Sequence, residues 1–322
     1  MRALKSWLTA FSVACVCTLA LGQSWPAKPI RLVVPFPAGG GTDIIARDVS
    51  NKLSSAAKWN FIVDNKPGSG GNLGVDAVAK AAPDGYTLVI GQTSNLAINP
   101  SLYSKLPYDS IQDLTPIGLI GRAPLVMVVP ANSPYKTLTD LVNAAKTPSA
   151  ELNYATSGNG TVAHLAVEMF QREAGIKLTH IPYKGASQGI TDVIGGLVHV
   201  YVSSVPTLIG YIKSGKLRAL AVTSLKRTDD LPQVPTVAES GYKNFEAVTW
   251  FGLLGPARLS STVVQTANQT LNKALSSPDL KTKLEDQGLD VAPGTPEQFA
   301  QLIRTDMAKW GQVVKASGAK AD

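Results

Sequence analysis

Short apolar runs alternate with stretches of helical periodicity along the first third of the chain. The apolar runs predict buried strands at residues 30–34, 61–63 and 86–90. Glycine-rich loops follow the first two strands. Apolar residues three and four positions apart then mark helices, at residues 44–53 and 75–78. The order strand, loop, helix, strand predicts a largely parallel sheet with helices on its faces.

The same alternation continues as a second unit, and the pattern then becomes helical. Strands are expected at residues 125–129, 152–155, 178–181, 198–202 and 217–222. Helices are expected between them at residues 138–145, 161–173 and 187–194. A last strand at residues 249–254 precedes two long helical patterns, at residues 263–275 and 299–314. The predicted fold class is therefore α/β with two such units.

The N-terminus carries an export pattern. Two basic residues precede an uncharged apolar run over residues 7–21, and small residues stand at positions 20 and 22. The run has about 15 residues, fewer than the roughly 20 that a membrane-spanning helix needs, so a membrane anchor is the less favoured alternative. We predict a signal peptide over residues 1–22 and a periplasmic location.

Composition narrows the classes of function. The formal charge is +7, and loss of Arg2 and Lys5 with the signal peptide leaves +5. Basic residues are scattered, so no nucleic-acid partner is expected, although a mild positive field suits anionic ligands. Both cysteines, Cys15 and Cys17, lie in the predicted signal peptide. The mature chain is therefore expected to have no disulfide, thiolate nucleophile or thiolate metal site.

Three segments share one design, in which a loop of glycine and hydroxyl residues joins a strand to a helix start. They lie at residues 36–43, 156–161 and 183–187. A helix start leaves N–H groups free and carries about half a positive charge, and glycine lets the backbone approach a ligand. One such loop is more often a connector, but three of them predict an anion site beyond the strand ends. Thr42 and Asp43 are expected to cap the first helix.

Other chemistries find little support in the sequence. Glycines 39–41 open a helix as in a dinucleotide fold, but Ile44 stands where the third glycine of G-x-G-x-x-G belongs. No H-E-x-x-H pattern occurs, and no nucleophile with a base within reach can be located, so no metal, cofactor or catalytic residue is predicted. For His164, packing or capping is favoured over ligand contact. Lys184 is equally compatible with ligand pairing and with a surface role, and Tyr183 is expected to be a cleft wall.

Several motifs spread over the mature chain carry a family resemblance. They are W-P at 25–26, K-P-I-R at 28–31, V-P-F-P-A-G-G-G-T-D at 34–43, N-K-P-G at 65–68, P-D-G-Y-T at 83–87, H-L-A at 164–166, P-Y-K-G at 182–185 and G-G at 195–196. With these motifs the chain resembles the extracytoplasmic receptors of tripartite tricarboxylate transporters, the TctC or Bug-receptor family. The resemblance covers essentially the whole mature chain.

The resemblance implies a type II periplasmic-binding-protein fold, in which a two-strand hinge joins two α/β lobes. Domain 1 would comprise residues 23–125 and 250–322, and domain 2 residues 126–249. In this family a ligand carboxylate sits against the first glycine loop, partly through ordered waters. The matching loop residues here are Phe36, Ala38, Gly39, Gly40, Thr42 and Asp43. The residues expected to face them across the cleft are Thr93, Ser94, Ser157, Gly158, Asn159, Gly160, Thr161, His164, Tyr183, Lys184 and Gly185.

One departure from the family pattern concerns the strand end after the G-G turn. Many relatives carry an acidic residue there, whereas this chain has Ser203 followed by Ser204, which we include in the predicted site. A cleft without that carboxylate does not favour an ammonium group. The predicted ligand is therefore a small amine-free organic acid, with dicarboxylates and aromatic acids included.

The resemblance thus predicts a monomeric, non-enzymatic receptor without a cofactor, which delivers a small carboxylate to membrane transporter subunits. A ligand sensor for signalling and an enzyme on the same two-lobed scaffold stay open as alternatives, because a fold does not determine a function.

Overall fold

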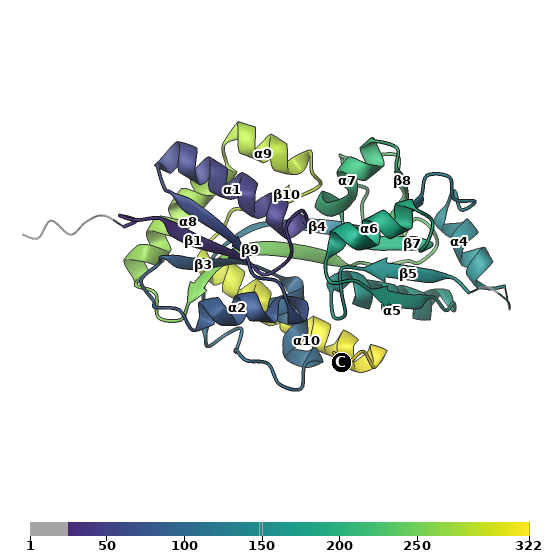
Figure 1. Ribbon diagram of the computed structural model, residues 1–322, viewed down its shortest axis with the longest axis horizontal. Helices are drawn as coiled ribbons and strands as arrows, with labels where there is room; N and C mark the ends of the chain where they lie inside the picture. Colours follow the sequence, from purple (N-terminus) through teal and green to yellow (C-terminus); the bar gives the residue numbers. More distant parts are fainter. Residues whose placement is uncertain (1–24, 148, 150, 322) are drawn as a thin grey trace, which may run out of the picture.

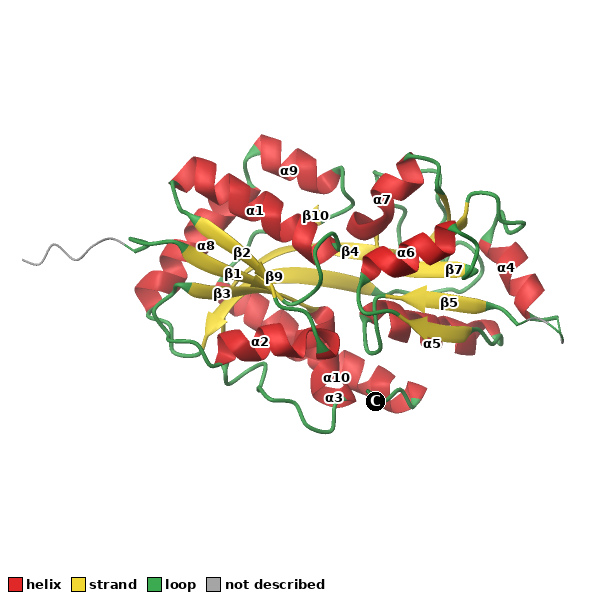
Figure 2. Cartoon of the chain, viewed as in Figure 1, coloured by secondary structure: helices red, strands yellow, loops and turns green. Residues whose placement is uncertain are grey.

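A mixed β-sheet runs through the molecule, with helices on both of its faces (Figures 1 and 2). The computed structural model describes residues 25–147, 149 and 151–321, so the predicted signal peptide lies outside the described residues. In this part of the chain the sheet has ten strands in the order β2-β1-β3-β9-β4-β7-β5-β6, and β10 and β8 each pair with β4. The predicted α/β class is confirmed.

One half of the sheet, which we call the β1 half, is built on three parallel strands. They are β1 (Ile30–Val34), β2 (Phe61–Asn65) and β3 (Thr87–Gln92). Their apolar runs are continuous because helices cover both faces of the sheet. The helices of this half are α1 (Gly41–Ala57), α2 (Asn72–Ala79), α3 (Asn99–Leu102), α8 (Ser261–Leu275) and α9 (Pro278–Glu285). The short strand β10 (Asp290–Val291), a 3₁₀ turn at Ser69–Gly71 and a π-helical turn at Ser94–Ile98 complete it.

The other half, the β5 half, contains the teal and green elements of Figure 1. Its parallel strands are β5 (Asn153–Thr156), β6 (Thr179–Pro182) and β7 (Val200–Ser204), and β8 (Leu217–Val222) pairs with β4. Its helices are α4 (Leu138–Ala145), α5 (Val162–Ala174), α6 (Ala186–Ile194) and α7 (Val205–Lys213). The strand-helix alternation predicted for this unit is therefore present, with α7 added.

Two antiparallel strands connect the halves. Strand β4 (Leu114–Pro130) pairs with β9 (Val248–Pro256) through residue 124 and with β7 and β8 from residue 125 onward. Both strands break the predicted parallel pattern, so the sheet is mixed, although β1, β2 and β3, and likewise β5, β6 and β7, are parallel. The predicted domain limits fall close to this exchange of partners, and the division into domains stays a prediction.

The hydrophobic core differs on the two faces of the sheet. One cluster extends over both halves, since it includes Val89, Tyr154 and residues of α10 (Pro296–Ser317) such as Trp310. The other two clusters stay within one half each: one packs α1, α8 and α9, and the other packs α6 and α7. The C-terminal helix α10 thus ties the two halves on one face, where it contacts β4, α3 and α5 (Figure 1).

Candidate functional site

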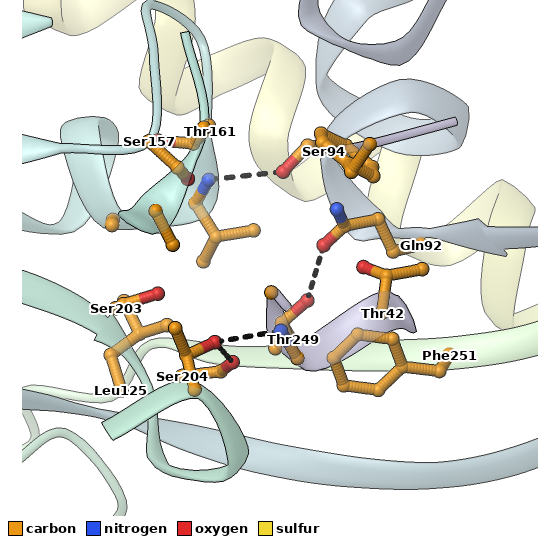
Figure 3. Close-up of a pocket in the computed structure, with 18 of the residues that line it drawn as sticks. Thr42, Gln92, Ser94, Leu125, Ser157, Thr161, Ser203, Ser204, Thr249 and Phe251 are labelled. Carbon is orange, nitrogen blue, oxygen red and sulfur yellow. Dashed lines mark hydrogen bonds between the residues drawn. The ribbon is translucent and has the colours of Figure 1, made fainter. Parts of the chain in front are cut away.

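A pocket lies where the two halves meet, at the carboxyl ends of their parallel strands, the usual ligand position in open α/β sheets. We call it the inner pocket, and its volume is about 50 Å³. Figure 3 shows side chains from both halves around the same space, among them Thr42, Gln92 and Ser94 facing Ser157, Ser203 and Ser204. Its lining residues are Phe36, Pro37, Gly40, Gly41, Thr42, Gln92, Ser94, Leu125, Ser157, Thr161, Val162, Ala163, Gly185, Ala186, Ser203, Ser204, Thr207, Thr249 and Phe251.

Four helix starts contribute to this lining. They belong to α1, α5, α6 and α7, whose N-caps are Gly40, Thr161, Gly185 and Ser204. A helix start leaves backbone N–H groups outside the helix's own hydrogen bonds and carries a partial positive charge, so the four starts together make this space electropositive. Hydroxyl side chains from Thr42, Ser94, Thr207 and others add neutral donors. The combined arrangement suits an anion with several acceptor oxygens.

The first glycine loop is held by Asp43. The structure places Gly40 at the N-cap without a side-chain cap, so the predicted capping by Thr42 and Asp43 is wrong, and both residues lie in the first turn of α1. The Asp43 carboxylate instead turns back to accept hydrogen bonds from the Gly39 N–H at 2.9 Å and from Arg47 and Asn65. Burial opposes ionisation of Asp43, but these hydrogen bonds outweigh it and hold its pKa below the ordinary value.

Direct hydrogen bonds join the two halves beside the inner pocket. The Gly41 N–H donates to Thr207 Oγ1 at 3.1 Å, and the Val162 N–H donates to Ser94 Oγ at 3.2 Å. The first N–H group of α1 and that of α5 have no partner within their own helices, and hydroxyl oxygens of the opposite half accept hydrogen bonds from them. The structure describes a conformation in which the halves touch across the site.

No charged side chain of the described residues lines the inner pocket. An anion there would be bound by N–H groups, hydroxyls and helix dipoles instead of by a cation. Among residues 25–321 as described, no three His, Cys, Asp or Glu side chains gather as a metal site requires. No helix in the described part of the chain is both long and apolar enough to span a bilayer.

The predicted site residues fall into three groups by position. Those that line the inner pocket are Phe36, Gly40, Thr42, Ser94, Ser157, Thr161, Gly185, Ser203 and Ser204. Gly158, Asn159, Tyr183 and Lys184 line a larger outer cavity that adjoins the inner pocket. Six residues line neither space: Ala38, Gly39, Asp43, Thr93, Gly160 and His164. Asp43 supports the loop from behind, as described, and contact of any of these residues with a ligand stays a prediction.

Tyr183 takes the position expected of a wall. Its hydroxyl donates to Asp192 Oδ2 at 2.6 Å, so the ring is fixed beside the outer cavity. Burial and the neighbouring Asp192 carboxylate raise the pKa of Tyr183 to about 12. The hydroxyl is therefore neutral at physiological pH and already engaged as a donor.

His164 lies in a stack of three rings behind the second glycine loop. Tyr154, His180 and His164 stack with ring centroids 4.7 and 4.2 Å apart. His164 Nδ1 accepts from the Gly160 N–H at 3.2 Å, and His180 Nε2 is hydrogen-bonded to Thr156 Oγ1 at 2.8 Å. Burial, and next the neighbouring His164, lower the pKa of His180 to about 3. The geometry agrees with the packing role that we favoured for His164.

Several lining residues were not predicted from the sequence. Gly41, Gln92, Thr207, Thr249 and Phe251 are the clearest cases. The start of α7 could have been predicted from the sequence, because Ser204 followed by Pro206 is a typical helix start with proline in the first turn. Thr249 and Phe251 lie on β9, and no local motif marks a strand that reaches the pocket only through the crossing of the two halves.

The chain is similar to known receptors over nearly its full length. Residues 45–319 match the tripartite tricarboxylate transporter family receptor. BugT of Bordetella pertussis is 37% identical over 299 residues, which cover 92% of each chain. An R. palustris protein solved with adipate is 33% identical with a TM-score of 0.89, and the match covers 92% of this chain and 99% of the other. MatC from Rhodopseudomonas palustris, solved with malate, is 28% identical with a TM-score of 0.84, over 90% and 100% of the two chains.

These matches confirm the predicted family, the predicted fold and the absence of enzymatic activity. The fold alone would not have excluded an enzyme, but the family match covers most of the chain and both halves of the sheet. The chain belongs to the tripartite tricarboxylate transporter receptor family and is a periplasmic solute-binding receptor.

Proposed function

We propose that this receptor captures a small organic acid between its two halves, with a ligand carboxylate in the inner pocket. The observation that carries the proposal is the convergence of four helix starts on a pocket lined without charged side chains. Backbone N–H groups and hydroxyls make charge-assisted hydrogen bonds to a carboxylate, and the helix dipoles add a favourable potential. Two relatives were solved with adipate and with malate, which supports this ligand class.

The ligand that we infer has no amino group near its bound carboxylate. Ser203 stands where many relatives carry an acid, and no carboxylate side chain in the described residues lines the inner pocket. An ammonium group placed there would lose its hydration without gaining a counter-charge, which is unfavourable. We further infer that the loaded receptor, as a monomer, delivers this acid to the membrane subunits of a tripartite transporter.

Calorimetry on the mature protein tests both parts of the proposal. Malate and aspartate differ at one position, by a hydroxyl against an ammonium, and glutarate and glutamate differ at one position by a hydrogen against an ammonium. We expect at least one amine-free acid to bind, and its amino counterpart to bind at least about tenfold more weakly. Mass spectrometry of the recovered ligand should show it unchanged. Equal affinity within both pairs would contradict the amine-free assignment, and no binding by any carboxylate would contradict the function.

A substitution in the first glycine loop locates the binding. Gly40 has an extended backbone with φ −83°, and a Cβ placed there lies 3.8 Å from its nearest neighbour, the Pro37 carbonyl oxygen. Gly40→Val should therefore fold normally while its side chain occupies the inner pocket and abolishes binding. Gly210→Val is the control, because an added Cβ on that exposed α7 residue meets nothing within 4 Å. Normal binding by Gly40→Val would show that the loop is only a connector.

A further inference from the structure

The inner pocket adjoins the larger outer cavity, which we call the vestibule. Its volume is about 530 Å³, about ten times that of the inner pocket. The two cavities share the lining residues Phe36, Pro37, Ser157, Thr161 and Gly185, so they adjoin. The vestibule is therefore the neighbouring cavity into which a ligand held at its carboxylate in the inner pocket can extend.

The size of the inner pocket limits what it can hold. One water-sized group requires about 10–15 Å³ on the same measure of volume, so about 50 Å³ admits about four such groups. A carboxylate and the carbon next to it fill that space. The rest of a larger acid lies outside the inner pocket. The vestibule is the adjoining cavity that can hold it and can then discriminate between acids that share the same carboxylate head.

Part of the vestibule wall is apolar and stiff, and glycine and polar residues form the rest. Four prolines line it, Pro35, Pro37, Pro67 and Pro182, together with the rings of Phe36, Tyr103 and Tyr183. Proline has a fixed φ and aromatic rings have few rotamers, so these walls lose little entropy when a ligand packs on them. Such walls suit methylene groups or an apolar ring.

One residue that lines the vestibule is charged. Lys184 is the only charged residue among the described residues that line the vestibule. It is exposed and forms no ion pair within the described part of the chain. It follows β6 and directly precedes Gly185, the N-cap of α6, so its backbone is held next to the shared wall of the two cavities.

We propose that the receptor selects elongated dianions, with one carboxylate in the inner pocket, an apolar spacer in the vestibule and a second anionic group paired with Lys184. The proposal rests on the proposed function, since it assumes that the first carboxylate lies in the inner pocket. It assigns chain length and a second charge as the features that the vestibule recognises, and Lys184 as the residue that recognises the charge.

Matched pairs of acids test the proposal. Adipate and hexanoate have equal chain length and differ in the second carboxylate, as do suberate and octanoate. We expect the wild-type receptor to bind the dianion of a pair about fivefold or more tightly, a moderate factor because Lys184 is partly in contact with solvent. Lys184→Gln should remove this preference and leave the affinity for the monocarboxylate unchanged.

Lys177→Gln is the control for the loss of one positive charge. Lys177 is also exposed and lies before β6, at the opposite end of that strand from Lys184. It should keep the preference for the dianion. The proposal is overturned if the wild type binds both members of a pair equally, if Lys184→Gln weakens both members equally, or if Lys177→Gln has the same effect. Binding of neither pair also overturns it, and the proposed function fails with it only if malate and glutarate do not bind either.

Discussion

Asp43 shows how a residue that lines no cavity can still shape the site. Its side chain is only 5% exposed, and it joins the loop, α1 and β2 through Gly39, Arg47 and Asn65. Because Arg47 compensates part of the desolvation, the ionised carboxylate is the stable form in the folded protein. The loop conformation that brings Gly40 and Gly41 to the pocket therefore depends on this charge.

We expect Asp43→Asn to lower the free energy of unfolding by about 2 kcal/mol at pH 7, because an amide cannot accept all of these hydrogen bonds. The folded pKa is lowered, so the contribution is present above the ordinary value of 3.8 and is lost as the pH falls through the folded pKa. Urea unfolding at pH 7 and pH 3 measures both effects. Asp279→Asn is the control, since Asp279 is 69% exposed in its ion pair with Lys52 and its substitution should cost much less stability than that of Asp43. Equal losses for both variants would contradict the role of Asp43.

The predicted site residues that line the inner pocket lie on local motifs. Gly40, Thr42, Ser157 and Thr161 stand in glycine and hydroxyl loops after strands, and the loop alone indicates their position. Gln92 and Thr249 line the same pocket from strand positions without a motif. Their contribution depends on β9 passing beside β3, a long-range pairing that no window of sequence shows.

At the scale of elements, the ring stack joins β5, β6 and α5 beneath the second glycine loop. His180 on β6 lies between Tyr154 on β5 and His164 on α5. Two of the hydrogen bonds of this stack reach the loop, at Gly160 and Thr156. A neutral stack is therefore part of what holds the loop in place.

The lowered pKa of His180, about 3, predicts how stability depends on pH. Unfolded His180 takes up a proton near its ordinary value of 6.5, whereas the folded form stays neutral, so stability falls as the pH drops from about 7 toward 3. His180→Gln removes that proton uptake. We expect the wild type to lose about 2 kcal/mol more stability than the variant between pH 7 and pH 5, as measured by urea unfolding. Parallel pH profiles of the two proteins would show that His180 is protonated equally in both states.

Elements were predicted best where apolar periodicity is unbroken. Residues 114–124 of β4 contain glycines 118 and 121, prolines 116 and 124 and a charged residue, so only the second part of the strand was predicted. This irregular stretch still forms a strand because it pairs with β9, and the register of that pairing shifts beside both glycines. Helix α7 was missed because Pro206 interrupts an apolar run, although proline at a helix start is favourable.

At the scale of the whole molecule, the distribution of apolar clusters over the two faces of the sheet indicates on which face the two halves can separate. On the α10 face, one cluster is continuous over both halves, so separation there would expose buried apolar side chains. On the other face, the clusters of the two halves are separate, and the contact between them includes the hydrogen bond from Gly41 to Thr207. Opening on that side would divide no shared apolar cluster. A bound ligand that touches both halves would favour the closed arrangement, because only that arrangement offers all its contacts.

Small-angle scattering tests this closure. We expect the radius of gyration of the mature protein to decrease when a binding carboxylate is added, because the ligand shifts the population toward the closed form. Gly41→Ala should oppose the shift, since the added Cβ would lie 2.8 Å from Thr207 Oγ1 and 2.9 Å from Ser204 Oγ, a contact made only when the halves meet. Overpacking costs about 1–3 kcal/mol, so affinity should fall about tenfold and the decrease in radius should shrink at moderate ligand concentration.

Gly210→Ala is the matched control for this closure test, because its added Cβ on the exposed face of α7 meets nothing within 4 Å and leaves the junction between the halves unchanged. It should therefore bind and contract as the wild type does. An unchanged radius in the wild type at saturating ligand, with an open ligand-free crystal structure, would contradict bridging of the two halves. Wild-type affinity in Gly41→Ala would show that the bound form does not need the contact between α1 and α7.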